Sequence, residues 1–315
     1  MSKTISWKGG LALTVIAAAV WGGAQAWAPD RPVDSLKARW APAPSQFIAV
    51  DGMSVHVRDE GPRDDPHPIV LLHGTSASLH TWDGWAEQLR ATRRVVRMDM
   101  PGFGLTGPNP SGDYTLLGYV AFVDHVLGQL GVKQAVVAGN SLGGEIAWLM
   151  ALHRPERVAR LVLVDSGGYA FPTEGMPIGF KLASIPALAP LTTRLLPRSA
   201  IESSVQSVYG HPERITPALI DRYQELTLRE GNRGSLIARF EQSPLGQHAD
   251  DVKRVRQPAL ILWGRRDRLI PPDHAQRFAQ DLPGSRVVMF DELGHVPQEE
   301  DPVATLAAAR AFMTP

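Results

Sequence analysis

The sequence predicts an α/β protein: a mostly parallel, doubly wound sheet with a helical cap inserted between two of its strands. The first observation is a set of six short apolar runs, which is typical of buried parallel strands. Helical patterns separate most of these runs, and that alternation indicates right-handed crossovers on both faces of a sheet. The runs are PIVLLHG (68–74), RRVVRMDM (93–100), QAVVAG (134–139), ARLVLVDS (159–166), PALILWG (258–264) and SRVVMFDE (285–292).

The second observation is an interval, residues 167–250, that contains no strand-like run. It holds amphipathic stretches such as ITPALIDRYQELTLRE (215–230). An insertion of this length between two strands is typical of a lid over the strand ends. We therefore predict a helical cap over 167–250 and a core formed by residues 46–166 and 251–315.

The remaining core elements follow from local patterns. FIAVDGMSVHVRDEG (47–61) alternates apolar and polar residues around Asp51-Gly52, which predicts a β-hairpin. Helical patterns occupy 114–131, 142–153, 274–282 and 303–313. For the last helix we expect the acidic run 299–301 to be a solvated start, with Asp301 as N-cap and Pro302 at the first helical position.

The N-terminal segment, residues 1–28, differs from the rest of the chain. Between Lys8 and Asp30 lie 21 residues without a charge. At about 1.5 Å per residue such a segment could cross a bilayer of roughly 30 Å, as a membrane anchor acting through residues 9–28. Ala24-Gln25-Ala26 equally matches the cleavage pattern of a signal peptide, and a buried core helix is the remaining alternative.

The orientation of that segment follows from its flanks. Lys3 and Lys8 precede the apolar run, which favours an N-in orientation. We therefore expect a protein that is exported, periplasmic or extracellular, or anchored so that it faces outside the cytoplasm. Residues 29–45 carry four prolines and are expected to form a linker or surface arm.

Composition excludes several classes of function. Basic and acidic residues number 32 each, so no surplus of positive charge indicates nucleic-acid binding. The chain has no cysteine, which removes disulfides, thiolate metal sites and cysteine nucleophiles. His56, His67, His80 and His248 have no metal-like spacing to each other or to carboxylates, so we expect no metal site. The oligomeric state is left open by the sequence.

A candidate nucleophile lies in AVVAGNSLGGEIAWLM (135–150), where Gly139-Asn140-Ser141-Leu142-Gly143 fits G-x-S-x-G between a predicted strand and a predicted helix. A turn this tight brings the residues two before and two after the serine against neighbouring backbone, where a Cβ would clash. Ser141 would then project its hydroxyl at the carboxyl edge of the sheet, above the positive end of a helix.

A serine needs a general base, and the base needs a group that holds its tautomer. His295 follows the last strand-like run directly, on a loop at the same edge of the sheet as Ser141. Asp267 follows the strand PALILWG at its carboxyl end, and Asp165, at the end of an earlier strand, is the competing acid. We predict the triad Ser141, Asp267 and His295.

Acyl transfer also requires donors for a developing oxyanion. His73-Gly74-Thr75-Ser76 ends the strand PIVLL, so a backbone N–H just after Gly74 would point toward Ser141. We assign the backbone N–H groups of Thr75 and Leu142 as the oxyanion hole. His73 is more simply a loop histidine bonded to backbone, and Asp99 is expected to order the turn after its strand.

Five ordered motifs resemble the α/β-hydrolase superfamily: HGTSAS (73–78), DMPGFG (99–104), GNSLGG (139–144), GRRDRLIP (264–271) and GHVPQEEDP (294–302). The resemblance covers about residues 46–315 and implies an α/β-hydrolase fold with a helical cap. It also implies a Ser-His-Asp hydrolase without a cofactor. The serine argues against the haloalkane dehalogenases and epoxide hydrolases of the superfamily, whose nucleophile is an aspartate.

Two branches of the superfamily compete. Asn140 and GGYAFPTEG (167–175) resemble the carbon–carbon bond hydrolases of aromatic ring-fission products. That branch usually has tryptophan where Val296 stands, and a cap arginine where the pattern ITPALIDRYQ places Tyr223, with Arg222 one residue early. We therefore favour hydrolysis of a small-molecule hydrophobic carboxylic ester or lactone, with carbon–carbon cleavage or a cofactor-free perhydrolase as alternatives.

The residues next to the predicted triad are the candidates for substrate contact. Ser76 follows the predicted oxyanion donor, Asn140 precedes the nucleophile, and Val296 follows the histidine. A non-enzymatic binding protein of this fold is a further alternative. The presence of all three triad residue types at the expected places disfavours it.

Overall fold

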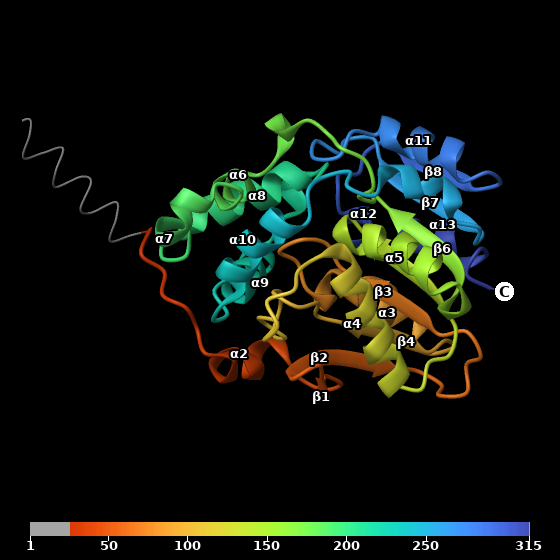
Figure 1. Ribbon diagram of the computed structural model, residues 1–315, viewed down its shortest axis with the longest axis horizontal. Coiled ribbons are helices and arrows are strands. Elements are labelled where there is room, and N and C mark those ends of the chain that lie inside the picture. The colour runs from red at the N-terminus through yellow and green to blue at the C-terminus, as the bar shows by residue number, and fades with distance from the viewer. Residues whose placement is uncertain (1–25, 315) are drawn as a thin grey trace, which may run out of the picture.

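The computed structural model describes residues 26–314 and shows an eight-stranded sheet with helices on both faces (Figure 1). The strand order is β1-β2-β4-β3-β5-β6-β7-β8; β1 and β2 form an antiparallel hairpin, β2 pairs antiparallel with β4, and every later pair is parallel. The strands are β1 (Gln46–Val50), β2 (Met53–Glu60), β3 (Ile69–Leu72), β4 (Val95–Met98), β5 (Ala135–Asn140), β6 (Val158–Val164), β7 (Ala259–Gly264) and β8 (Arg286–Phe290). The predicted fold class, the hairpin and all six apolar strands are confirmed.

The parallel strands bury both of their faces, because successive side chains point to opposite sides of a strand. In β3, Val70 and Leu72 enter one hydrophobic cluster, while Ile69 and Leu71 enter another on the opposite face. Helices α4 (Leu116–Gln129), α5 (Leu142–His153) and α11 (Asp273–Asp281) contribute to the first cluster. Helices α3 (Asp83–Leu89) and α13 (Pro302–Arg310) contribute to the second.

The interval predicted as a cap contains helices and joins β6 to β7. These helices are α6 (Ile178–Ala183), α7 (Ala189–Thr192), α8 (Arg198–Val208), α9 (Pro217–Thr227) and α10 (Asn232–Gln242). They lie to one side of the sheet, at the left of Figure 1. Helix α9 begins as its sequence suggests, with the Thr216 side chain accepting a hydrogen bond from the Leu219 N–H.

The segment expected to be a linker, residues 29–45, instead contains helix α2 (Val33–Trp40). Leu36 is buried with Leu105 and Leu226, which gives this short helix an apolar anchor. Its last turn is held to α9 by polar contacts: Arg39 pairs with Asp221 and Glu225, and the Trp40 indole donates to Glu225. The expectation of a linker needs correction, because burial and ion pairing outweigh the proline content.

The N-terminal prediction for residues 1–28 lies almost wholly outside the described residues. From Ala26 the described chain runs beside the cap, where the Leu196 N–H donates to the Ala26 carbonyl and the Ala28 N–H donates to the Arg194 carbonyl. Within residues 26–314, no helix is both long and apolar enough to cross a bilayer.

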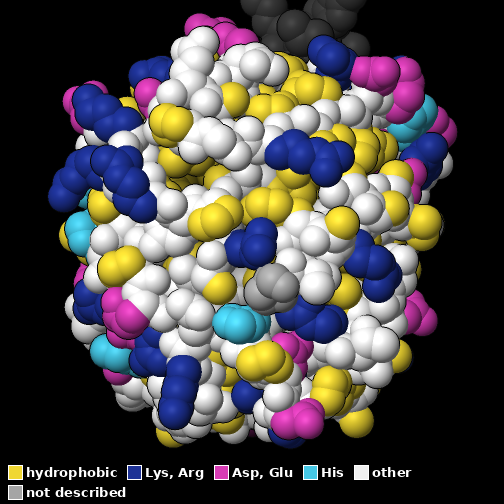
Figure 2. All heavy atoms as spheres, turned by 90° about the vertical axis from the view of Figure 1, so that its right-hand side faces the viewer, with side chains coloured by type: hydrophobic (Ala, Val, Ile, Leu, Met, Phe, Trp, Pro, Cys, Tyr) yellow, Lys and Arg dark blue, Asp and Glu magenta, His cyan; other side chains and the backbone are white. Residues whose placement is uncertain are grey.

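The face that carries the C-terminus mixes charges of both signs (Figure 2). Lysine and arginine side chains are interspersed there with acidic ones, and hydrophobic side chains are exposed in small groups. This pattern agrees with the formal net charge of zero. No field of one sign gathers on this face to attract a polyanion.

Candidate active site

Ser141 lies at a strained turn between β5 and α5. Its backbone has φ 55° and ψ −118°, a conformation that residues with a Cβ seldom adopt. A Cβ on Gly139 would lie 2.1 Å from the Gly143 carbonyl oxygen, and one on Gly143 would lie 2.2 Å from the Leu72 carbonyl oxygen. Both flanking glycines are therefore required by backbone contact, as the sequence argument anticipated.

His295 and Asp267 meet on neighbouring loops at the carboxyl ends of β8 and β7. His295 Nδ1 lies 2.7 Å from Asp267 Oδ2, and both side chains are buried. The other oxygen, Oδ1, accepts from the backbone N–H groups of Leu269 (2.7 Å) and Ile270 (3.0 Å). This arrangement holds the carboxylate in place. His295 Nε2 has no hydrogen-bond partner among residues 26–314, so this nitrogen can act on another group.

Ser141 and His295 both line one cavity. Among the described residues there is no hydrogen bond between the Ser141 hydroxyl and the imidazole. Such bonds often tighten only when a substrate binds, so the arrangement remains compatible with a nucleophile and its general base.

Asp165, the competing acid, lies behind the same pair. One oxygen of Asp165, one of Asp267 and a ring nitrogen of His295 lie within 4.8 Å of one another. Three such ligand atoms could approach a metal ion, but Asp267 already uses its oxygens on His295 and two backbone N–H groups. The direct bond to His295 goes to Asp267.

The loop after β3 brings the second expected oxyanion donor near the serine. A Cβ on Gly74 would lie 3.1 Å from the Ser141 Cβ, so no larger residue fits there without displacement. Thr75 and Leu142, the two residues assigned to the oxyanion hole, line the cavity together with Ser141. His73 Nδ1 donates to the Gly74 carbonyl, and burial lowers the pKa of His73, which agrees with a structural role.

The cavity has a volume of about 410 Å³ and extends from Ser141 into the cap. Its size is within the range of small-molecule sites. Most of its wall is apolar; cap residues in it include Met176, Ile178, Phe180, Leu182, Leu191, Leu195 and Phe240. A substrate with a substantial hydrocarbon part would match this wall.

Two buried ionisable side chains also line the cavity. Glu145, one helical turn after Ser141, and Arg239 of α10 are each about 95% buried. Burial raises the pKa of Glu145, and burial lowers the pKa of Arg239. Glu145 Oε1 and Arg239 Nε have no partner among the described residues, so two buried polar atoms of the cavity-lining side chains are left without a hydrogen bond.

The three residues predicted to contact substrate do not play equal parts. Ser76 and Val296 line the cavity. Asn140 also lies there, but its amide nitrogen donates to the carbonyls of Val164 (3.1 Å) and His295 (2.9 Å). Asn140 therefore ties the histidine loop to β6, and its amide hydrogens are already bonded.

Glu299 and Glu300 correct the expectation of a solvated acidic run. Both side chains are largely buried. They belong to α12 (Pro297–Glu300), a separate short helix between the histidine loop and α13. Glu300 accepts from the backbone N–H groups of Gly210 and Gly294 and so joins the cap to the histidine loop. Only Asp301 behaves as predicted, capping α13 by accepting from the Ala304 N–H.

Arg222 and Tyr223, the residues near the expected cap arginine, both contact Glu299. Arg222 forms a buried ion pair with it, and the Tyr223 hydroxyl donates to it at 2.8 Å. Tyr223 lines the cavity, whereas the Arg222 charge is offset by Glu299. The sequence pattern did not reveal this pairing, because the two segments lie far apart in the chain.

The fold, the serine elbow and the buried histidine–aspartate pair together define the class of α/β hydrolases. The sequence profile described as "alpha/beta hydrolase fold" matches residues 67–302. The chain therefore belongs to the α/β-hydrolase family, and the resemblance seen in its motifs is confirmed.

Individual relatives are distant. The chain is 29% identical to 2-hydroxymuconate semialdehyde hydrolase of Pseudomonas putida over 82% of its own length and 90% of that protein. A hydrolase structure from Pseudomonas aeruginosa PA01 is 25% identical, with a TM-score of 0.72, and the match covers 87% of this chain and 99% of that one. The structure of a membrane phospholipase A is 23% identical, with a TM-score of 0.73 and 96% of both chains covered; at that identity the likeness concerns the fold.

Proposed function

We propose that this protein is a serine hydrolase that cleaves a hydrophobic carboxylic ester or lactone. The observation that carries the proposal is Ser141 on a strained turn in an apolar cavity that it shares with His295, whose other nitrogen is held by buried Asp267. A reactive serine needs a general base and an acid that orients this base, and ester hydrolysis requires in addition only oxyanion donors and water.

The reaction would proceed through an acyl-enzyme. The Ser141 oxygen attacks the carbonyl carbon while His295 Nε2 takes the hydroxyl proton, and the N–H groups of Leu142 and Thr75 hold the oxyanion. Collapse of this intermediate breaks the bond to the leaving oxygen, which receives the proton from His295. Water then repeats the sequence, so that the acid is released and the Ser141 hydroxyl is restored.

Carbon–carbon bond hydrolysis is the second candidate. It is favoured by the similarity to 2-hydroxymuconate semialdehyde hydrolase and by Asn140 beside the nucleophile. Against it, Arg222 is paired with Glu299 and Val296 replaces an aromatic residue next to His295. Ester hydrolysis remains our preferred proposal for these reasons.

We further propose that the protein works outside the cytoplasm, exported or tethered to a membrane through residues 9–28. Ala26, where the described chain begins, lines the cavity. Five of the seven exposed large hydrophobic residues described lie on the cap or beside Ala26: Trp27, Ile178, Leu182, Ile185 and Leu191. Ile178, Leu182 and Leu191 also line the cavity, and exposed apolar side chains beside a cavity suit contact with lipid or with a lipid-like substrate.

Labelling and a substrate panel test the proposed function. A fluorophosphonate probe should label wild-type protein at Ser141 and fail to label Ser141→Ala. Among p-nitrophenyl esters, kcat/KM should rise with acyl length from acetate to octanoate, because each buried CH₂ adds roughly 0.8 kcal/mol of binding. Hydrolysis of a dienone-type ring-fission product, without hydrolysis of any ester, would instead establish the carbon–carbon activity.

A further inference from the structure

A second carboxyl group, Asp165, lies behind the proposed catalytic acid and is not used by the mechanism above. It ends β6, is fully buried, and adopts φ 42°. Its Oδ1 accepts from the Gly264 N–H at 3.0 Å. Its Oδ2 is buried without a partner among the described residues.

The Asp165 carboxyl group lies close to the Asp267 carboxylate. One oxygen each of Asp165 and Asp267 lies within 4.8 Å of a ring nitrogen of His295 and of the other. Asp267 accepts three hydrogen bonds, from His295, Leu269 and Ile270, which favours its charged form. Asp165 accepts one, so a proton shared by the two acids resides more favourably on Asp165.

Electrostatics also favours the proton on Asp165 rather than on Asp267. Burial and the adjacent Asp267 carboxylate raise the pKa of Asp165 well above its ordinary value. Two carboxylates this close cannot both ionise without a large penalty, and a protonated acid provides a hydrogen-bond donor where a charged one provides none.

We propose that Asp165 is a positioning residue that stays protonated and donates its Oδ2 hydrogen to the Asp267 carboxylate. This bond draws charge from Asp267 and so moderates the basicity of His295. The proposal rests on the proposed function for its catalytic readout, since Asp165 acts on the reaction only through Asp267 and His295.

The same geometry predicts a second role for Asp165: it can replace Asp267 as the acid that bonds to His295 when Asp267 is absent. If the Asp267 carboxylate is removed, Asp165 still has an oxygen within 4.8 Å of a His295 ring nitrogen, and no charged carboxylate at position 267 favours its protonated form. It can then ionise and become the partner of the imidazole. Some catalysis should therefore survive the loss of Asp267.

The experiment compares substitutions at both acids, with p-nitrophenyl butyrate as substrate. Asp165→Ala removes the donor, whereas Asp165→Asn keeps an N–H donor that cannot ionise, and asparagine tolerates positive φ. Without the donor, more charge stays on Asp267 and His295 holds its proton to higher pH. The acid limb of the kcat/KM profile should thus move up by about half a pH unit or more in Asp165→Ala and return to its wild-type position in Asp165→Asn.

A second pair of variants tests whether Asp165 can replace Asp267. Asp267→Ala should retain at least tenfold more activity than Asp267→Ala combined with Asp165→Asn. Equal activities, or an acid limb in Asp165→Ala that coincides with wild type, would overturn the proposal, because a purely structural Asp165 would change only the folded fraction. Fluorophosphonate titration gives the concentration of competent sites in each variant.

Two further measurements separate a failure of this proposal from misfolding of a variant and from a failure of the proposed function. If Asp165→Ala does not fold, as judged by circular dichroism, the two Asp267→Ala proteins decide the matter. Should the protein prove to hydrolyse no ester, the proposed function fails, but an NMR titration of the His295 ring in wild type and Asp165→Asn and Asp165→Ala still reports on the bond. The same order of ring pKa values is then expected, and identical values in all three proteins would refute it.

Discussion

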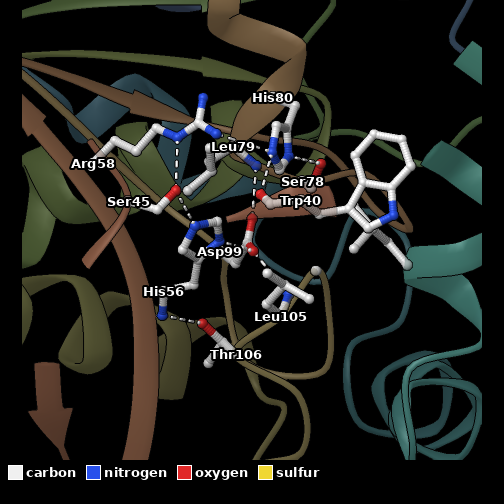
Figure 3. A network of polar contacts seen from close by, with 12 residues as sticks. Trp40, Ser45, His56, Arg58, Ser78, Leu79, His80, Asp99, Leu105 and Thr106 are labelled. Atoms are coloured by element: carbon white, nitrogen blue, oxygen red, sulfur yellow. Dashed lines mark hydrogen bonds and ion pairs between the residues drawn. The ribbon is translucent and has the colours of Figure 1, made fainter. Parts of the chain in front are cut away.

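Two sets of serine, histidine and aspartate occur in this molecule, and they differ in their surroundings more than in their hydrogen bonds. In the cavity, His295 Nδ1 lies 2.7 Å from Asp267. The second set, which we call the hairpin cluster, consists of Ser45, His56 and Asp99. His56 lies on β2, its Nδ1 lies 2.7 Å from Asp99, and its Nε2 lies 2.8 Å from the Ser45 hydroxyl (Figure 3). The second set thus has the complete chain of contacts that a catalytic triad requires.

The surroundings of Ser45 nevertheless exclude the role proposed for Ser141. Ser45 lines neither of the two described cavities, and the Arg58 Nε–H donates to its oxygen at 3.0 Å (Figure 3). That bond occupies a lone pair that a nucleophile would use. Ser141, in contrast, stands on a turn with positive φ, above the start of α5 and inside a cavity.

The acid of the second set organises backbone. Asp99 accepts from the N–H groups of Leu79 (2.7 Å) and Leu105 (2.8 Å) in addition to His56 (Figure 3). Burial alone would raise the pKa of Asp99, but the charge and hydrogen bond of His56 bring it below its ordinary range. Contacts among the three side chains are therefore insufficient for catalysis. Access to substrate, oxyanion donors and a free serine lone pair distinguish a candidate active site from a structural cluster.

The largest effect should separate the two serines. Ser141→Ala is expected to lower kcat toward p-nitrophenyl butyrate by at least ~10³-fold, since nucleophile lesions in triads cost several orders of magnitude. Ser45→Ala should stay within about threefold of wild type in activity per folded molecule. Initial rates normalised to folded protein provide the measurement.

The reverse result would contradict the assignment of Ser141 as the nucleophile. If Ser45→Ala lost activity as severely as Ser141→Ala while its circular dichroism remained native, the hairpin cluster would be catalytic and our assignment of the cavity would be wrong.

The next effect concerns the two acids. Asp99→Asn leaves three donors with a weaker, uncharged acceptor and should destabilise the fold by about 3 kcal/mol, while kcat of the folded fraction is retained. Asp267→Asn should destabilise less, because without the Asp267 charge the folded protein no longer has to keep Asp165 protonated at neutral pH, but it should lower kcat by about 10³-fold or more. Urea unfolding and steady-state kinetics on both variants measure these effects. Equal losses of stability in the two variants would contradict the proposal that Asp165 is kept protonated beside Asp267.

Much of this site could be predicted because its rules are local. The elbow around Ser141 follows from steric contacts that only glycine permits at positions 139 and 143. Asp267 and His295 follow from the rule that carboxyl ends of parallel strands share one edge of a sheet. The hairpin and the Asp301 cap are equally local, and the structure agrees with both.

Other features depend on packing between distant segments, which no local pattern encodes. Glu300 became a buried acceptor for backbone of the cap, and the amide of Asn140 bonds the histidine loop. Helix α2 forms in a proline-rich segment because α9 offers it partners. Ser45 lies in the same segment, so the contact of Ser45 with His56 could not be expected from spacing either.

The smallest effect should appear in the pH dependence of stability, through His80 at the edge of the hairpin cluster. His80 is buried between Ser78 and the Trp40 carbonyl (Figure 3), and burial lowers its pKa to about 3. Its ordinary value is 6.5. As pH falls below 6.5, the unfolded chain therefore binds a proton that the folded protein refuses, and stability declines until about pH 3.

Replacing His80 by glutamine removes this proton uptake by the unfolded chain, and so tests whether the hairpin cluster has a structural role. Each pH unit below 6.5 carries up to about 1.4 kcal/mol, so at pH 5 the wild type should have lost roughly 2 kcal/mol that His80→Gln does not lose. Asp99 adds little in this range, because its depressed pKa makes its own contribution disappear only in stronger acid. Urea titrations of both proteins between pH 5 and pH 7.5 measure the difference in slope; parallel stability curves would mean that His80 takes up its proton without unfolding and that the cluster is more open than its burial indicates.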